Sequence, residues 1–341
     1  MDETPLHSSQ LKRKIFALYA GLIPANVGAW VYALFQLHDH PLLLGTAALA
    51  YGFGLRHAVD ADHIAAIDNV TRKLMQDGSR PVTVGLFFAL GHSSVVFAAS
   101  ALVALTAGEI AQIGALKAVA GTLSTIISAG FLFAIALANI SILISLLKLR
   151  RRLKSGTAQS VDTGAPIAAG LIARLLRPMF ALISASWQMI PLGLLFGLGF
   201  ETATEVSVMG LSASQASAGA PMSLALVFPT LFAAGMSLVD ATDGVLMVGA
   251  YHWAFVEPRR KLTYNLAITL LSSAVAVMIG SVETAGLIAQ HFHLTASLWS
   301  ATQRIVEHFN LLGMIIICLF ATGWLGSVAV TRLRAPRPEE G

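Results

Sequence analysis

The residues most able to do chemistry lie together in the run Arg56-His-Ala-Val-Asp-Ala-Asp-His63, which interrupts an otherwise apolar stretch. The run holds two imidazoles, His57 and His63, and two carboxylates, Asp60 and Asp62. Ionisable side chains are costly inside a membrane, by roughly 2.5–3.5 kcal/mol each on insertion scales. Imidazole nitrogen and carboxylate oxygen form a borderline ligand set that suits divalent Ni, Co, Zn, Fe or Mn. The run therefore indicates a site for a divalent transition-metal ion.

Helical geometry distributes these four side chains unequally. At about 100° per residue, His57, Asp60 and His63 share one side of a regular helix and face one cavity. Asp62 points elsewhere, so a role for it requires local unwinding, or an outer position holding the second nitrogen of a histidine. Two glycines one turn upstream could permit such a break, and broken helices are where transporters place their ion sites.

Three further apolar segments carry polar groups of the same kind. One places His92 within Leu90-Gly-His-Ser-Ser. The next carries Glu201 and Glu205, which share a helix face at spacing i,i+4, and a later one carries Asp240 and Asp243 at i,i+3. We expect His92 to be a further metal ligand, and the two acidic pairs to line the transport path.

The balance of charge inside the apolar segments is strongly negative. Against the single base Arg56 stand seven carboxylates: Asp60, Asp62, Asp68, Glu201, Glu205, Asp240 and Asp243. Neighbouring carboxylates in a low dielectric repel one another unless a proton or a cation relieves them. Arg56 is expected to neutralise part of the cluster, and the remaining negative charge calls for a bound cation.

Composition sets the class of the protein. Hydrophobic residues make up 56% of the 341 residues and charged residues 12%, against about 25% charged in soluble domains. The chain is therefore predicted to be an all-α, polytopic integral membrane protein. Its single cysteine, Cys318, excludes an intrachain disulfide and a thiolate cluster. It has no Walker sequence, so no ATPase site of that type and no ATPase subunit is implied.

Hydropathy predicts eight transmembrane helices. They lie at roughly 15–36, 42–68, 82–107, 119–147, 180–210, 222–250, 263–289 and 311–331. Of the 22 Lys and Arg residues, all but Arg56, Lys117 and Arg304 fall in the two termini and in alternate loops. The positive-inside rule then places both termini in the cytoplasm. The excess of basic residues thus reflects the topology, and anionic membrane lipids are the expected partners of these residues. It does not indicate nucleic-acid binding.

The span order predicts two halves. Residues 1–147 form a four-helix half with the histidine motif, 148–179 a polar cytoplasmic loop, and 180–341 a four-helix half with the acidic motifs. No cleavable signal peptide is expected, because a charged arm precedes a first apolar run that is too long for one. The expected location is the bacterial cytoplasmic (inner) membrane, crossed several times.

The motifs resemble those of the nickel/cobalt transporter family. Its second helix carries H-x4-D-H, which His57, Asp62 and His63 match, and the segments around His92, Glu205 and Asp240 resemble its other signatures in the same order. The resemblance covers essentially the whole chain. It implies a secondary permease, not an enzyme, that takes up Ni²⁺, with Co²⁺ as a further candidate substrate and no cofactor.

One residue departs from the family pattern, and two other functions stay open. Glu201 stands where the family is expected to have Asp, so a direct ligand role at this position is less secure. The loop 148–179 has no histidine, whereas the related efflux branch tends to have a histidine-rich loop, which favours uptake. The alternatives are an intramembrane metalloenzyme and a transporter of protons or organic cations.

Overall fold

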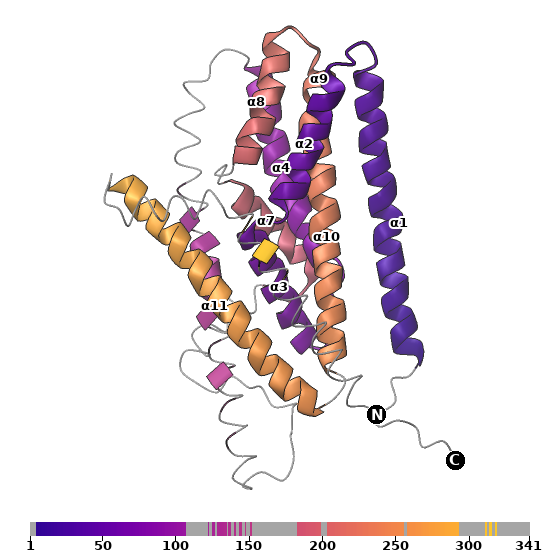
Figure 1. Ribbon diagram of the computed structural model, residues 1–341. Coiled ribbons are helices and arrows are strands. Elements are labelled where there is room, and N and C mark those ends of the chain that lie inside the picture. Colours follow the sequence, from indigo (N-terminus) through magenta and orange to yellow (C-terminus); the bar gives the residue numbers. More distant parts are fainter. Residues whose placement is uncertain are drawn as a thin grey trace.

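The computed structural model describes residues 5–106, 183–198, 203–255 and 258–292, with scattered positions between 122 and 151 and between 311 and 318. Within these residues the regular structure is entirely helical (Figure 1). The elements are α1 (Pro5–Gln36), α2 (Leu43–His57), α3 (Ala61–Gln76), α4 (Val84–Leu105), the 3₁₀ turn η1 (Ser186–Gln188), α7 (Met189–Gly197), α8 (Ala203–Ser217), α9 (Met222–Ala225), α10 (Val227–Phe255) and α11 (Pro258–His291).

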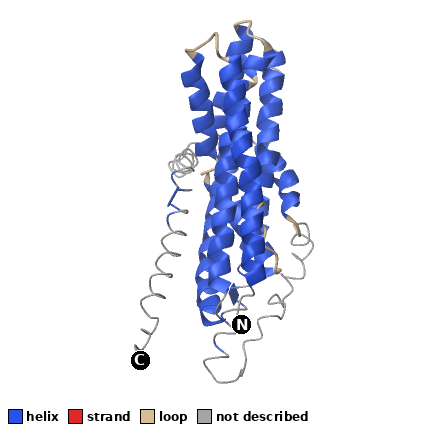
Figure 2. Cartoon of the chain, turned by 90° about the vertical axis from the view of Figure 1, so that its right-hand side faces the viewer, coloured by secondary structure: helices blue, strands red, loops and turns tan. Residues whose placement is uncertain are grey.

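Helices α4 and α10 form the centre of the bundle. They pack on each other, α2 packs on α10, and α7 packs on α4. The most apolar window of α10 is 56% buried and that of α4 is 44% buried, whereas that of α1 is 22% buried. Helix α1 therefore lies at the periphery. Figure 2 shows most helices running along the long axis of the bundle, and Figure 1 shows that α11 crosses it obliquely.

Glycines bring the central helices into backbone contact. A methyl group at Gly85 of α4 would lie 1.8 Å from the carbonyl oxygen of Asp240 on α10. One at Gly54 of α2 would lie 2.1 Å from the Phe232 carbonyl oxygen, and one at Gly193 of α7 would lie 2.1 Å from that of Phe88. Small residues at helix crossings are the usual means by which membrane helices approach closely, because lipid supplies no hydrophobic drive for their association.

The span predicted at 42–68 is not one continuous helix. Helix α2 ends at His57, and α3 begins at Ala61 after Asp60 adopts an extended backbone with φ −65° and ψ 145°. The break thus falls three residues beyond Gly54, within the metal motif itself. The span predicted at 180–210 is likewise divided, between α7 and α8.

These breaks leave α2, α3 and α7 too short to cross a membrane alone. Among the described residues, three helices combine sufficient length and apolarity: Ser9–Gln36, Val84–Leu105 and Met222–Tyr251. With 15 residues, α2 is about 22 Å long, short of the about 30 Å hydrocarbon core. Helix α2 therefore cannot cross the membrane by itself, and His57 stands at its end. The predicted spans at 119–147 and 311–331 and the loop 148–179 lie largely outside the described residues.

A second difference concerns Arg72, which the hydropathy places in a loop. It lies within α3 and is 1% exposed. Its Nη1 donates to Thr269 Oγ1 of α11 at 2.9 Å, and its Nη2 donates to Asn69 Oδ1 at 3.0 Å. One turn earlier, Asp68 accepts a hydrogen bond from Tyr251 of α10. These polar contacts join α3 to α10 and α11 below the helix break.

Candidate metal centre

Three imidazoles from separate helical segments meet at the break between α2 and α3. His57 is the last residue of α2, His63 lies in the first turn of α3, and His92 lies midway along α4. Their exposed fractions are 2%, 0% and 3%. One ring nitrogen from each lies within 4.8 Å of the others. The fold therefore gathers, in a fully buried place, three imidazole nitrogens that could bind a metal ion.

One ring nitrogen of His57 is held by its neighbours, and the other points to the centre of the cluster. Its Nδ1 donates to Asp60 Oδ2 at 2.9 Å, and Thr204 Oγ1 lies 3.5 Å from the same nitrogen. Asp60 makes this contact instead of capping the start of α3 with its side chain. A carboxylate on the outer nitrogen fixes the ring orientation and raises the basicity of the inner one, as in many metal sites.

His63 is held in the same way by α10. Its Nδ1 lies 3.3 Å and 3.4 Å from the two carboxylate oxygens of Asp240. Its Nε2 is buried and has no hydrogen-bond partner among the described residues. Since a buried nitrogen without a partner is costly, this atom is suited to an electrophile that approaches from the centre of the cluster.

Glu205 of α8 places a carboxylate oxygen beside the imidazoles. Its Oε1 lies 2.8 Å from His92 Nε2 and 3.8 Å from His57 Nε2, and the residue is 2% exposed. The same His92 nitrogen lies 2.9 Å from His57 Nε2. An ion bound here would contact α2, α3, α4 and α8 at once.

The separation of the two Nε2 atoms fits shared coordination. Two imidazoles that bind one ion at about 2.1 Å and at a right angle have nitrogens about 3.0 Å apart. In the absence of an ion, two nitrogen lone pairs at 2.9 Å repel, and a proton is needed between them. The donor set of three imidazoles and one carboxylate suits Ni, Co or Zn more than Mg or Ca, which prefer oxygen.

Aromatic rings close the cluster off from water. Phe88 of α4 packs edge-on against His63 with ring centroids 4.8 Å apart, and Phe232 of α10 lies 5.5 Å from His57. Both phenylalanines are fully buried. A dry surround strengthens charge–ligand interactions, so the rings favour binding of a dehydrated ion.

The other predicted site residues are placed differently. Asp62 is half-buried, and its Oδ1 has no hydrogen-bond partner among the described residues; it does not hold a histidine. Asp243 is buried one turn beyond Asp240, with Oδ2 equally unpartnered in that part of the chain. Arg56 is exposed, and no ion pair joins it to the carboxylates that are described. Glu201 lies outside the described residues.

Comparison with known proteins identifies the family of the chain. The model of the NicO family, described as a high-affinity nickel-transport protein, matches residues 43–330. The chain belongs to this family. It is 51% identical over 326 residues to a high-affinity nickel transport protein of Cupriavidus necator, covering 95% of this chain and 93% of the relative.

Two other relatives extend the comparison. The hydrogenase nickel incorporation protein HupN of Bradyrhizobium diazoefficiens is 48% identical over 317 residues, covering 92% of this chain and 83% of the relative. The cobalt transport protein NhlF of Rhodococcus rhodochrous is 38% identical over 301 residues, covering 86% of this chain and 85% of the relative. No solved structure matches the chain. Membership in the nickel-transport family makes this a membrane transporter, not an enzyme.

Three residues that the motifs did not single out contribute to the site. Thr204 lies beside His57, and Phe88 and Phe232 enclose the imidazoles. Thr204 stood inside the acidic motif next to Glu205, so its position gave a signal. Apolar rings in apolar helices give no such signal, because the sequence alone does not say which face they share with a histidine.

Proposed function

We propose that this member of the nickel-transport family takes up Ni²⁺ across the bacterial cytoplasmic membrane and binds the dehydrated ion in the cluster of His57, His63, His92 and Glu205. The observation that carries the proposal is the convergence of three buried imidazole nitrogens within 4.8 Å. Asp60 and Asp240 orient two of the rings from outside. Asp62 and Asp243, whose buried oxygens have no partner among the described residues, are proposed to receive the ion as it leaves.

The described conformation corresponds to an occluded state of the transport cycle. The cluster histidines are at most 3% exposed, so an ion in their midst reaches neither side without a conformational change. The divided helices α2/α3 and α7/α8 meet at the cluster, and discontinuous helices commonly accompany alternating access. We propose that movement of these half-helices against α4 and α10 opens the two sides in turn.

The membrane potential is the proposed driving force. Moving a divalent ion inward across 100 mV yields about 4.6 kcal/mol, enough to concentrate it some thousandfold without ATP. The proposed topology has eight spans with both termini in the cytoplasm, because the basic residues gather in the termini and in alternate loops. In this arrangement residues 1–147 and 180–341 form two halves joined by the loop 148–179.

Selectivity is expected to come from geometry. Intrinsic affinities of such ligands favour Cu²⁺ over Ni²⁺, and Ni²⁺ over Co²⁺. The buried cluster is fixed by Asp60, Asp240 and the glycine contacts of α4, so it presents ligands at set separations. We propose Ni²⁺ as the main substrate and Co²⁺ as a second one, and the cobalt transport protein among the relatives is in keeping with this.

Uptake of ⁶³Ni²⁺ by cells that express the chain tests the proposal. His57→Ala and Asp62→Asn are expected to reduce uptake to the level of cells without the protein, at matched amounts in the membrane. His38→Ala, in the exposed turn after α1, is the matched control and should retain uptake. Uptake that survives both substitutions contradicts the proposed metal site. Proton or organic-cation flux into proteoliposomes without metal would favour the alternative transporter.

A further inference from the structure

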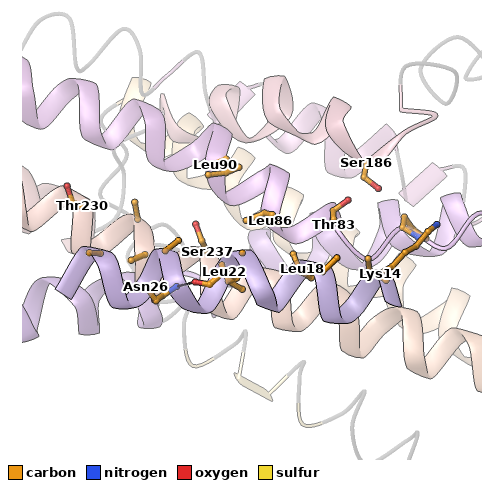
Figure 3. A pocket seen from close by; sticks show the side chains of 18 of the residues that line it. Lys14, Leu18, Leu22, Asn26, Thr83, Leu86, Leu90, Ser186, Thr230 and Ser237 are labelled. Carbon is orange, nitrogen blue, oxygen red and sulfur yellow. Dashed lines mark hydrogen bonds between the residues drawn. The ribbon is translucent and has the colours of Figure 1, made fainter. Parts of the chain in front are cut away.

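A groove runs along the peripheral helix α1, beside the places where α1 packs on α10 (Figure 3). It has a volume of about 830 Å³ and is bounded by α1, α4 with the segment before it, and α10. This volume is within the about 300–1,000 Å³ of pockets that hold drug-sized molecules. None of the cluster histidines lines the groove, so it is a feature separate from the metal centre.

The groove is charged at one end and apolar along its length. Lys14 lies at the same end as Thr83 and Ser186, whereas Asn26 and Thr230 lie towards the other (Figure 3). Arg80, three residues before Thr83, also lines it. Its Nη1 is buried and has no hydrogen-bond partner among the described residues. Two cations and two hydroxyl groups at one end of an apolar groove match an anionic headgroup.

Two polar groups deeper in the groove, Asn26 and Thr230, already have hydrogen-bond partners within the protein. Asn26 donates from its side-chain amide to the Leu22 carbonyl oxygen at 3.0 Å and accepts from Tyr51 at 3.1 Å. Thr230 Oγ1 donates to the Leu226 carbonyl oxygen at 2.7 Å. With these groups occupied, the walls present mainly aliphatic side chains such as Leu18 and Leu86. That surface suits a hydrocarbon chain better than a polar solute or a metal ion.

The length of the groove matches one leaflet of a bilayer. Its lining on α1 runs from Lys14 to Ala29, which is about 22 Å at 1.5 Å per residue. Half of a bilayer including its headgroup region is about 20–22 Å thick. The basic end belongs to the cytoplasmic side by the positive-inside rule, and anionic lipids are concentrated in that leaflet.

We propose that this groove binds one anionic phospholipid of the cytoplasmic leaflet. The phosphate lies between Lys14 and Arg80, where it satisfies the buried guanidinium nitrogen, and an acyl chain fills the space between α1 and α10. The lipid then joins α1, whose apolar window is mostly exposed, to the helix that carries Asp240. Nickel binding in the histidine cluster does not depend on this proposal.

Native mass spectrometry of the delipidated full-length protein measures the binding directly. Phosphatidylglycerol and phosphatidylcholine with identical acyl chains are added separately. Phosphatidylglycerol is expected to bind about 30-fold more tightly, equivalent to about 1 kcal/mol for each cation. Lys14→Gln/Arg80→Gln is expected to abolish this preference. Lys12→Gln/Arg13→Gln, which removes the same charge from exposed residues of α1 outside the groove, should keep it.

A second pair of variants tests the groove without altering charge. Gly21 lines it and has open space where a side chain would lie, so Gly21→Leu is expected to displace the lipid. Gly28→Leu, also in open space but outside the groove, is the matched control. Equal binding of the two lipids, or a preference that survives the loss of both cations, overturns the proposal. So does a change in oligomeric mass with Gly21→Leu while the lipid count stays constant, because a second copy would then occupy the groove.

Discussion

His57 and His92 face each other through their Nε2 atoms at 2.9 Å, although 35 residues separate them in the chain. His57 ends a half-helix and His92 lies in the middle of a continuous one. The contact therefore depends on the packing of α2 and α4 on their shared neighbour α10. A nitrogen pair at this separation could bind one metal ion, as proposed above for the cluster.

Loss of the carboxylate behind His57 should weaken metal binding without removing a ligand. Asp60→Ala frees Nδ1 and lets the ring rotate, so Ni²⁺ affinity is expected to fall about 10–100-fold, as for other outer partners of metal-binding histidines. Calorimetric titration of the purified protein measures this. Asp39→Ala, which removes a carboxylate that is 73% exposed, should leave the affinity unchanged. An unaltered affinity in Asp60→Ala would show that Asp60 does not orient the ring.

Ni²⁺ affinity should depend on the negative charge of Glu205 more than on the size of its side chain. Glu205→Gln keeps the size of the side chain but removes the negative charge 2.8 Å from His92, and a neutral oxygen is a weaker partner for a cation. Ni²⁺ affinity is expected to fall by at least about tenfold. The control is Glu283→Gln, a buried glutamate on α11 that accepts from Ser128 at 3.1 Å. Equal losses in both variants would point to a general effect of buried charge.

Nickel should stabilise the folded protein through this cluster. A ligand at 100 times its dissociation constant raises the free energy of unfolding by about 2.7 kcal/mol. The Tm should therefore rise when Ni²⁺ is added and return to its metal-free value after addition of a chelator. Mg²⁺ should have little effect, because it prefers oxygen ligands. The rise is expected to vanish in His57→Ala/His92→Ala, measured by the same thermal melts. A rise that persists in this double variant would place the metal elsewhere.

The closest helix crossing should tolerate no side chain. Gly85→Ala places a methyl group 1.8 Å from the Asp240 carbonyl oxygen, so α4 and α10 must separate. We expect the free energy of unfolding to fall by about 1–3 kcal/mol or more. Ni²⁺ binding should also weaken, because Asp240 moves away from His63. Thermal melts and nickel titration of one sample measure both effects.

The matched control for this crossing is Gly28→Ala. It adds the same methyl group to the peripheral helix α1 in open space, and an alanine is favoured over glycine in a helix by roughly 0.5–1 kcal/mol. Its stability should therefore stay the same or rise slightly. If Gly85→Ala behaves like Gly28→Ala, the crossing of α4 and α10 is looser than the structure describes.

The sequence by itself determined that this is a membrane protein, and it predicted a transition-metal site. That inference rests on the cost of placing imidazoles and carboxylates in apolar segments, which holds however the segments pack. The motif residues also indicated the family, and the comparisons confirmed it. His57, His63, His92 and Glu205, all named from the sequence, lie together in the structure.

Only the tertiary structure decided how these residues are paired. A constant 100° per residue places His57, Asp60 and His63 on one face of a single helix. In the structure the helix is interrupted after His57, so this spacing no longer relates the three side chains, and Asp60 contacts the outer nitrogen of His57. The contacts of His63 with Asp240 and of His92 with Glu205 join residues 177 and 113 positions apart. The periodicity of one segment carries no information on such pairs. They follow from the packing of α3 on α10 and of α4 on α8, which fixes where each helix meets its neighbour.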